Sequence, residues 1–131
     1  MKYSVLLIIS LVVGLHVQVQ AQKALEIPRK IVVGIEKGDA KSVALFFNDN
    51  LELAVLGTEN IYSKRQAEFI LQKFFRENVP QGFYIKHQGG KKNTTYFIAD
   101  LTTTNGRFKM VILLKETDQL VKIHQLRIEN E

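Results

Sequence analysis

The 131-residue chain contains no cysteine. Disulfides therefore cannot stabilise its fold, and no lipid can be attached through a cysteine side chain. Thiolate ligands for a metal are excluded for the same reason. The fold must be stabilised by packing alone.

A long uninterrupted apolar run is also missing. The apolar run over residues 5–13 is followed by several polar side chains, whereas a helix that spans the hydrocarbon core needs about 20 apolar residues. We therefore expect no stable membrane anchor. Lys2, this short apolar core and the small residue Ala21 are the three parts of a secretory signal peptide. We predict that residues 1–21 are cleaved and that residues 22–131 form one exported domain, periplasmic or extracellular.

Clustered positive charge is scarce as well. The net charge is +5, but the basic residues are scattered, and adjacent basic pairs such as Lys64-Arg65 and Lys91-Lys92 lie far apart along the chain. A nucleic-acid-binding face needs basic residues gathered on one surface or along one helix. We therefore expect no nucleic acid partner.

Recognisable catalytic and cofactor motifs are also absent. The sequence has no nucleophile elbow, no glycine-rich phosphate loop and no dinucleotide fingerprint. One of the three histidines, His16, lies in the predicted signal, and the other two have no partner at metal-ligand spacing. We expect neither a cofactor nor a metal.

The N-terminal half of the predicted domain shows the apolar spacing of helices. Apolar side chains recur at three- and four-residue intervals and predict a helix over residues 24–37. Gly38 ends this helix, and Asp39 is placed to cap a second one over residues 40–48. The second helix is short, so we expect it to lie across the first.

A strand and a third helix follow. Residues 51–56 alternate and predict a strand. Ser63 and Gln66 have the spacing of a capping box, in which each side chain satisfies a backbone N–H of the first helical turn. This pattern predicts a helix over residues 63–78, which Pro80 stops.

The C-terminal half alternates in the manner of β-strands. Four strands are predicted over residues 82–88, 94–104, 107–115 and 120–129. Asn105-Gly106 predicts a two-residue type I′ hairpin turn, because both residues tolerate positive φ. The four strands therefore form a meander, and the fold class is α+β with helices on one face of a curved sheet.

This order of elements (α-α-β-α-β-β-β-β), with its Gly38-Asp39-Ala40 junction, resembles the nuclear transport factor 2-like (cystatin-like cone) superfamily. Within it, the chain is similar to small exported bacterial proteins of unknown function. The resemblance implies N-terminal helices packed on the concave side of a curved, mainly antiparallel sheet, and often dimers through the outer sheet face. The superfamily includes isomerases, dehydratases, cyclases, carriers and binding domains, so membership alone does not give the function.

The resemblance also suggests what an enzyme of this fold would require. The steroid-isomerase branch uses a tyrosine on the first helix and two inward acids. Here no tyrosine lies between Gln22 and Tyr62, and the acids Glu26 and Glu36 lie off the apolar stripe of the first helix. We do not expect that mechanism.

The sharpest enzyme hypothesis is an isomerase- or dehydratase-type reaction with a His–Asp pair as an oriented general base. His87 alternates in phase with Ile85, so it faces the cavity if that face is inward. His124 is in phase with Leu126, and Asp100 lies on the long second strand of the meander. In the alternative interpretation, all three are ordinary surface or half-buried residues.

Non-catalytic binding is the preferred hypothesis, with a small apolar ligand or an exported protein as partner. Tyr62, Tyr84 and Tyr96 are the candidate ligand contacts at a pocket mouth. The strand over residues 107–115 is apolar on both faces, which predicts a homodimer through the outer sheet face. A third alternative is an association module that uses the tip of the Asn105-Gly106 hairpin.

Overall fold

The computed structural model describes residues 24–131. The predicted signal peptide lies outside the described residues, so its cleavage and the export of the domain stay predictions. The described residues form three helices and six strands. In chain order these are α1 (Arg29–Glu36), α2 (Ala40–Ala44), β1 (Phe47–Val55), β2 (Thr58–Ser63), α3 (Lys64–Glu77), β3 (Pro80–Lys91), β4 (Thr94–Thr103), β5 (Gly106–Thr117) and β6 (Leu120–Asn130).

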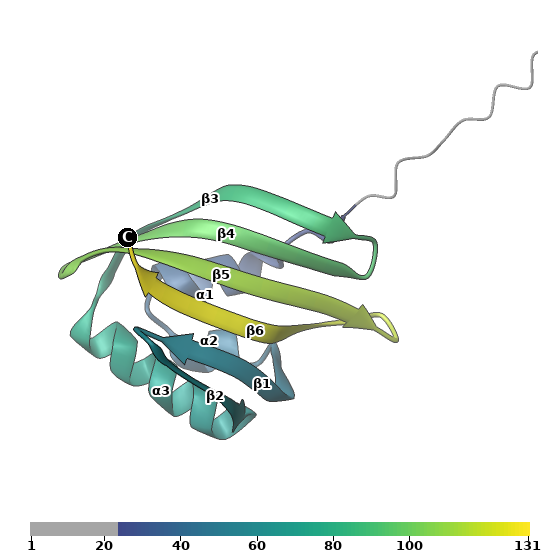
Figure 1. The fold of residues 1–131 in the computed structure, drawn as a ribbon, viewed down its shortest axis with the longest axis horizontal. Helices are drawn as coiled ribbons and strands as arrows, with labels where there is room; N and C mark the ends of the chain where they lie inside the picture. The colour runs from purple at the N-terminus through teal and green to yellow at the C-terminus, as the bar shows by residue number, and fades with distance from the viewer. Residues whose placement is uncertain (1–23) are drawn as a thin grey trace, which may run out of the picture.

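All six strands form one sheet in the order β2-β1-β6-β5-β4-β3. The four C-terminal strands are the predicted antiparallel meander. The hairpin of β1 and β2 joins it through a parallel pairing of β1 with β6. The sheet is curved, and α1 and α2 lie behind it in the view of Figure 1.

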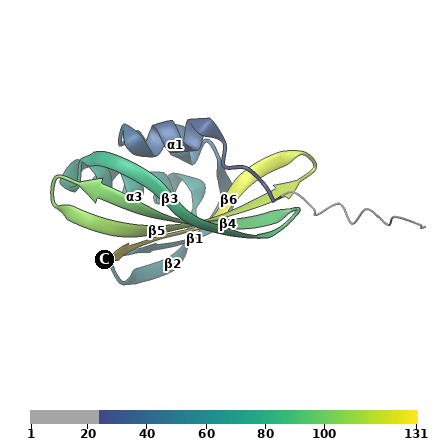
Figure 2. The same ribbon diagram turned by 90° about the horizontal axis from the view of Figure 1, so that it is seen from above.

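The helices and the concave face of the sheet enclose one apolar core. Figure 2 shows α1 lying over this face. The core is built mostly of aliphatic and phenylalanine side chains from alternating strand positions and from the inner sides of the three helices. Its largest fully buried members include Phe47, Phe97, Ile31 and Met110. The predicted α+β architecture with helices on one face of a curved sheet is confirmed.

The first two helices are shorter than predicted. The segment before Pro28 is not helical, and α1 begins only at Arg29. The backbone N–H of Leu25 instead donates to Thr95 Oγ1 at 3.0 Å, which ties this segment to β4. The second helix ends at Ala44 rather than at residue 48, because the chain enters the sheet at Phe47. Asp39 caps this helix as predicted, accepting from the Ser42 N–H.

The capping box that opens α3 is confirmed. The Ser63 hydroxyl accepts from the Gln66 N–H, and the Gln66 side chain accepts from the Ser63 N–H. The predicted element order was wrong in one respect, since it lacked β2. That strand lies at the sheet edge and is mostly exposed, so it has no clear apolar alternation for a sequence pattern to show. Leu56 and Gly57, both with positive φ, connect it to β1.

The Asn105-Gly106 hairpin is confirmed, but its predicted turn type is wrong. Thr103 pairs with Gly106, and of the turn residues only Gly106 has positive φ (122°), so the turn is not type I′. The tip packs against its own chain: the Asn105 amide donates to the Glu77 carbonyl, and the Thr104 N–H donates to the Val79 carbonyl at 3.0 Å. These contacts join the hairpin to the end of α3.

Candidate functional site

Most of the space between the helices and the sheet is filled by the core. Among the described residues, only three polar side chains are buried, namely Asn78, Thr95 and Thr103, and none of them is ionisable. Each makes hydrogen bonds to the backbone. No buried side-chain nitrogen or oxygen in the described part of the chain lacks a partner. The core of the described domain therefore contains no buried ionisable side chain.

His87 does not face the concave side, so the predicted inward phase is wrong. The pairing of β3 with β4 shifts between Ile85, which pairs with Ala99, and His87, which pairs with Ile98. Lys86 is the extra residue of this β-bulge, and a bulge changes the face on which the following side chains lie. His87 consequently lies on the outer face, where its ring centroid is 6.1 Å from that of Tyr96.

His124 is displaced from the core by a second bulge. Leu114 pairs with Ile123 and Leu113 pairs with Gln125, so His124 is the extra residue on β6. Its predicted phase with Leu126 is therefore wrong, and its side chain is half-buried on the outer face. Burial, followed by the nearby charges of Lys115 and Lys122, lowers the pKa of His124.

Asp100 also lies on the outer face, as an ion-pair partner of cations. Its carboxylate is 3.5 Å from Lys86 Nζ and 3.5 Å from an Arg107 guanidinium nitrogen. The two histidines are on β3 and β6, which β4 and β5 separate in the sheet, so they are about 14 Å apart across the strands. Among the described residues, the carboxylate of Asp100 forms ion pairs with Lys86 and Arg107 and none with a histidine, so the hypothetical His–Asp pair is not formed.

An apolar groove runs between α3 and the β1–β2 hairpin, and we call it the α3 groove. It consists of two adjoining hollows of about 590 and 450 Å³ that share Tyr62, Phe69 and Ile70. Phe69 is 63% exposed, although phenylalanine side chains are usually buried in folded proteins. Of the three candidate tyrosines, Tyr62 is the one that lies in this groove. Arg65 and Lys73 are at its polar rim.

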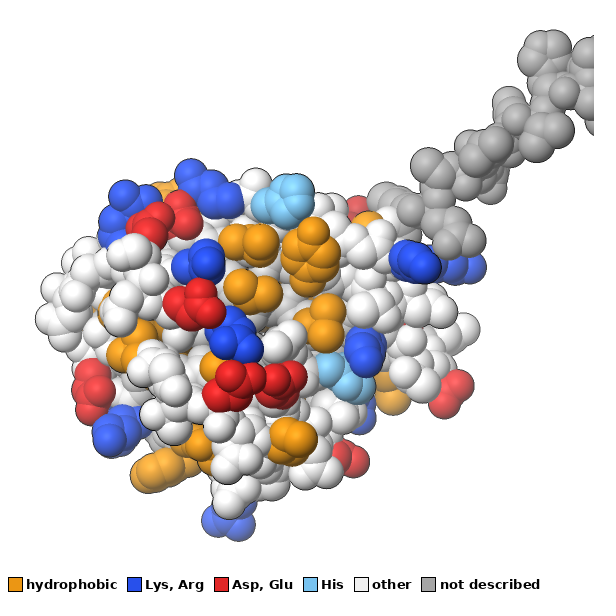
Figure 3. Space-filling model, viewed as in Figure 1, with side chains coloured by type: hydrophobic (Ala, Val, Ile, Leu, Met, Phe, Trp, Pro, Cys, Tyr) orange, Lys and Arg blue, Asp and Glu red, His pale blue; other side chains and the backbone are white. Residues whose placement is uncertain are grey.

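Tyr96 lies instead on the outer sheet face, in an apolar patch with Ile98, Val111 and Leu113. Tyr96 is directly opposite Leu113, and Ile98 is directly opposite Val111. Tyr84, which is 62% exposed, pairs with Asp100 on the neighbouring strand. Figure 3 shows hydrophobic side chains gathered over the middle of this face with charged side chains around them. The outer face of the sheet is therefore apolar at its centre.

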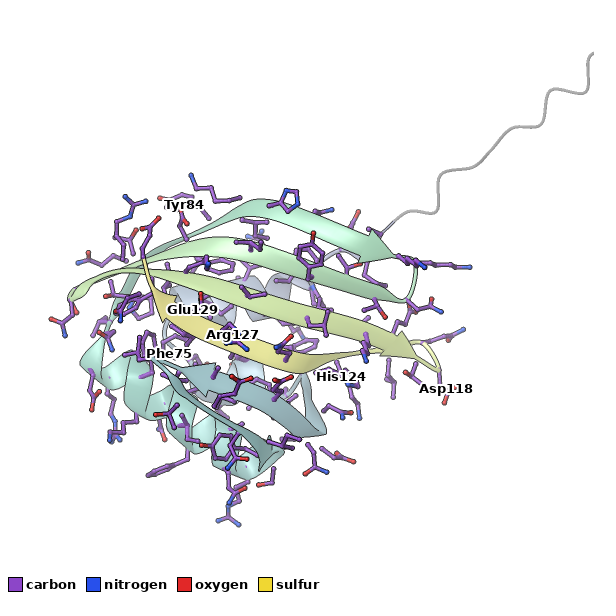
Figure 4. All side chains as sticks on the ribbon, viewed as in Figure 1. Phe75, Tyr84, Asp118, His124, Arg127 and Glu129 are labelled. Carbon is purple, nitrogen blue, oxygen red and sulfur yellow. The ribbon has the colours of Figure 1, made fainter. Side chains whose placement is uncertain are left out.

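The charges around the patch have both signs. Lys109 lies 3.2 Å from Glu129 and Arg127 lies 3.0 Å from Glu59. Glu59 is also hydrogen-bonded to Glu52, which raises the pKa of Glu52 and, with Arg127 nearby, lowers the pKa of Glu59. Figure 4 labels Arg127 and Glu129, which lie two positions apart on β6 and 3.6 Å from each other. The rim therefore has no strong excess of one sign.

Residues 24–131 contain no group of three or more histidine, aspartate or glutamate side chains placed to bind a metal ion. No helix in that same part of the chain is long and apolar enough to cross a bilayer.

Sequence patterns missed the α3 groove. Phe69 falls two residues after the buried Ala67, about 200° around the helix, so it lies off the apolar stripe of α3. A large aromatic side chain on the polar side of an amphipathic helix was the available signal. The outer patch was expected from the two-sided apolar character of β5.

The model of DUF4783, a domain of unknown function, matches residues 28–129. A DUF4783 family protein from Bacteroides ovatus is 30% identical, with a TM-score of 0.76 over 81% of this chain and 96% of that chain. One from Bacteroides fragilis is 26% identical, with the same TM-score over 81% of this chain and 100% of that chain. The described domain thus corresponds to a whole crystallised relative.

More distant structures share the fold. An NTF-2 like protein of unknown function from Shewanella oneidensis is 14% identical, with a TM-score of 0.61 over 78% of this chain and 92% of that chain. The resemblance to the nuclear transport factor 2-like superfamily is therefore confirmed at the level of the fold. No curated protein matches the chain.

Proposed function

We propose that this chain, which belongs to the DUF4783 family of domains of unknown function, is a non-catalytic binding domain. Its ligand is a small apolar molecule held in the α3 groove. The observation that carries the proposal is the exposed Phe69, which lines the groove beside Tyr62 and Ile70. Export to the periplasm or the cell exterior is part of the same proposal and rests on the pattern of residues 1–21.

The dimensions and lining of the groove suit such a ligand. Small-molecule sites are usually apolar concavities of about 300–1,000 Å³ with a few polar groups that fix orientation. Each hollow of the α3 groove falls in this range, and Arg65, Gln66 and Lys73 supply polar groups at the rim. The isomerase or dehydratase alternative is less well supported, because the described residues bury no titratable side chain.

The test uses a neutral apolar fluorophore, N-phenyl-1-naphthylamine, with residues 22–131. Phe69→Ser should weaken fluorophore binding about tenfold or more, since covering a phenylalanine side chain contributes about 1.5–3 kcal/mol. Leu45→Ser is the matched control, because Leu45 is equally exposed (69%) but lies in the turn between α2 and β1. Equal binding by the two variants would show that the groove is not the site.

A second candidate function, binding of a protein partner, is favoured by the outer apolar patch, and the partner we propose is a second copy of this chain. Tyr96, Ile98, Val111 and Leu113 form two directly opposed apolar pairs on the outer face of the sheet. The rim carries Lys109 and Glu129 among charges of both signs, so two copies can meet without net repulsion.

Sedimentation velocity on residues 22–131 tests the homodimer. Val111→Glu should convert a species of twice the chain mass into one of single mass, because a buried unpaired carboxylate opposes association. Thr102→Glu adds the same charge on the same face, two positions beyond Asp100 on β4, and should leave the dimer intact. A single-mass wild type at tens of micromolar would reject the dimer, since an interface of standard size should persist there.

A further inference from the structure

A hollow of about 250 Å³ lies on the outer face where β5 turns into β6. Its wall includes Lys115, Asp118, Lys122 and His124, together with Asn48 from the start of β1. Figure 4 labels Asp118 and His124 at this end of the sheet. We call it the β5–β6 hollow. It lies beyond the apolar patch along β5 and is separate from the α3 groove.

The register of the two strands places like charges together here. Lys115 is the direct cross-strand partner of Lys122. Like charges directly opposite one another in a sheet are destabilising, because their Cβ atoms are only about 4.5–5.5 Å apart. Among the described residues, neither lysine is within ion-pair distance of a carboxylate, whereas Lys86, Lys109, Arg107 and Arg127 all have such partners. Within the described residues, no ion pair therefore offsets the repulsion between these two lysines.

Two further donors point to the same place. The bulge on β6 inserts His124 beside Lys122, so the imidazole lines the hollow instead of the core. The Asn48 side-chain amide donates one hydrogen bond to the Asn50 carbonyl and retains a second N–H. His124 and Asn48 are both half-buried, which limits the conformations open to their side chains.

We propose that the β5–β6 hollow binds a dianionic phosphoryl group, with the ammonium groups of Lys115 and Lys122 and the imidazole and amide N–H groups of His124 and Asn48 as donors. An anion between the lysines removes the repulsion that their register creates. Charge-assisted hydrogen bonds of this kind are about twice as strong as neutral ones. The hollow has the volume of about eight water molecules, which is room for a phosphoryl group and part of its hydration shell.

Asp118 is the one carboxylate among the residues that line the hollow, and it provides a test of opposite sign. It opposes an anion in the hollow, so its removal should strengthen binding while removal of the lysines should weaken it. A surface that attracts anions only through its general charge would respond weakly to each single change, because exposed charges are screened within about 10 Å at ordinary salt.

The experiment is a titration of residues 22–131 with inorganic phosphate, followed by backbone and histidine NMR signals at constant ionic strength. We expect saturable shifts confined to the strands around Asn48, Lys115, Lys122 and His124. Occupation by phosphate should also raise the pKa of His124, because a nearby anion favours the charged imidazolium. Linear, unsaturated shifts, or an unchanged His124 pKa at saturating phosphate, would overturn the proposal.

Matched variants separate this site from general basicity. Lys115→Gln with Lys122→Gln should weaken phosphate binding about tenfold, and Asp118→Asn should tighten it about threefold. Lys91→Gln with Lys92→Gln removes the same charge from the β3–β4 hairpin and should leave binding unchanged. Equal effects of the two double variants would overturn the proposal. Retained amide shifts elsewhere in the sheet confirm that each variant is folded.

A last arm distinguishes free phosphate from a lipid headgroup. Vesicles of phosphatidylcholine with phosphatidic acid present the same group on a surface. Saturable binding of inorganic phosphate supports the site, whether the phosphoryl group comes from free phosphate or from a lipid. Vesicle binding that requires Lys115 and Lys122 identifies the lipid headgroup as the source of the phosphoryl group. Vesicle binding without any saturable response to inorganic phosphate would indicate diffuse attraction and overturn the site. None of these readouts depends on the neutral fluorophore or on the dimer.

Discussion

Gly34 allows α1 and α2 to approach closely, and replacing it should destabilise the domain even though alanine is the better helix former. Gly34 is buried on α1. A Cβ atom built at this position lies 2.9 Å from Val43 Cγ2 and 3.4 Å from the Val43 nitrogen. The first distance is shorter than carbon atoms tolerate, so one of the two helices has to shift.

The magnitude follows from two opposing effects. Glycine to alanine in a helix interior stabilises by about 1 kcal/mol. Overpacking a core contact destabilises by about 1–3 kcal/mol. Val43 cannot turn its methyl group away at little cost, because a β-branched side chain in a helix has one strongly preferred rotamer and Val43 is only 1% exposed. We therefore expect Gly34→Ala to lower the free energy of unfolding by about 1 kcal/mol, or Tm by about 5 °C.

A double-mutant cycle by urea unfolding checks the assignment to this contact. Val43→Ala removes the methyl groups that collide with the new Cβ, so Gly34→Ala should change from destabilising to stabilising in the Val43→Ala background. The expected coupling is about 1–2 kcal/mol. A gain in stability for Gly34→Ala alone, or additive effects in the double variant, would refute the argument from close packing.

Two further predictions concern the outer face and a turn. Glu52→Gln should raise Tm at pH 7, because an amide donates to Glu59 at any pH, whereas Glu52 does so only when protonated. The folded-state pKa of Glu52 is raised, so wild-type stability grows as pH falls through that pKa and the difference should shrink by pH 4.5 in differential scanning calorimetry. Gln119→Gly should stabilise by about 0.5 kcal/mol, because Gln119 has a φ of 64°. Gln119→Ala should give no such gain in the same calorimetric scans, and equal gains would contradict the backbone explanation.

The elements of the fold were predictable where the signal was local. The capping box of Ser63 and Gln66 fixes the start of α3 by hydrogen bonds that depend on adjacent residues alone. The meander was predictable because β4 and β5 alternate regularly and bury every second side chain. The mostly exposed edge strand β2 gave no such alternation.

The candidate site was less predictable, because β-bulges change the phase of alternation. A single extra residue, Lys86 on β3, moves His87 from the expected inner face to the outer one. The bulge at His124 does the same on β6. Neither bulge has a glycine or proline to mark it, and both are set by pairing with the neighbouring strand. The side-chain chemistry was visible in the sequence, but the face that carries it was not.

The position of β6 constrains how the domain acquires its fold. Among the described residues, β6 is the last element in chain order, yet it lies in the middle of the sheet and is the one strand that pairs both with the β1–β2 hairpin and with the meander. Until these 11 residues are available, the two halves have no shared strand and Leu126 and Ile128 leave a gap in the core. Pairing β1 with β6 also requires closure of a long loop, which slows folding. A chain that is synthesised from its N-terminus therefore cannot complete this fold step by step, because the sheet closes only after β6 is available.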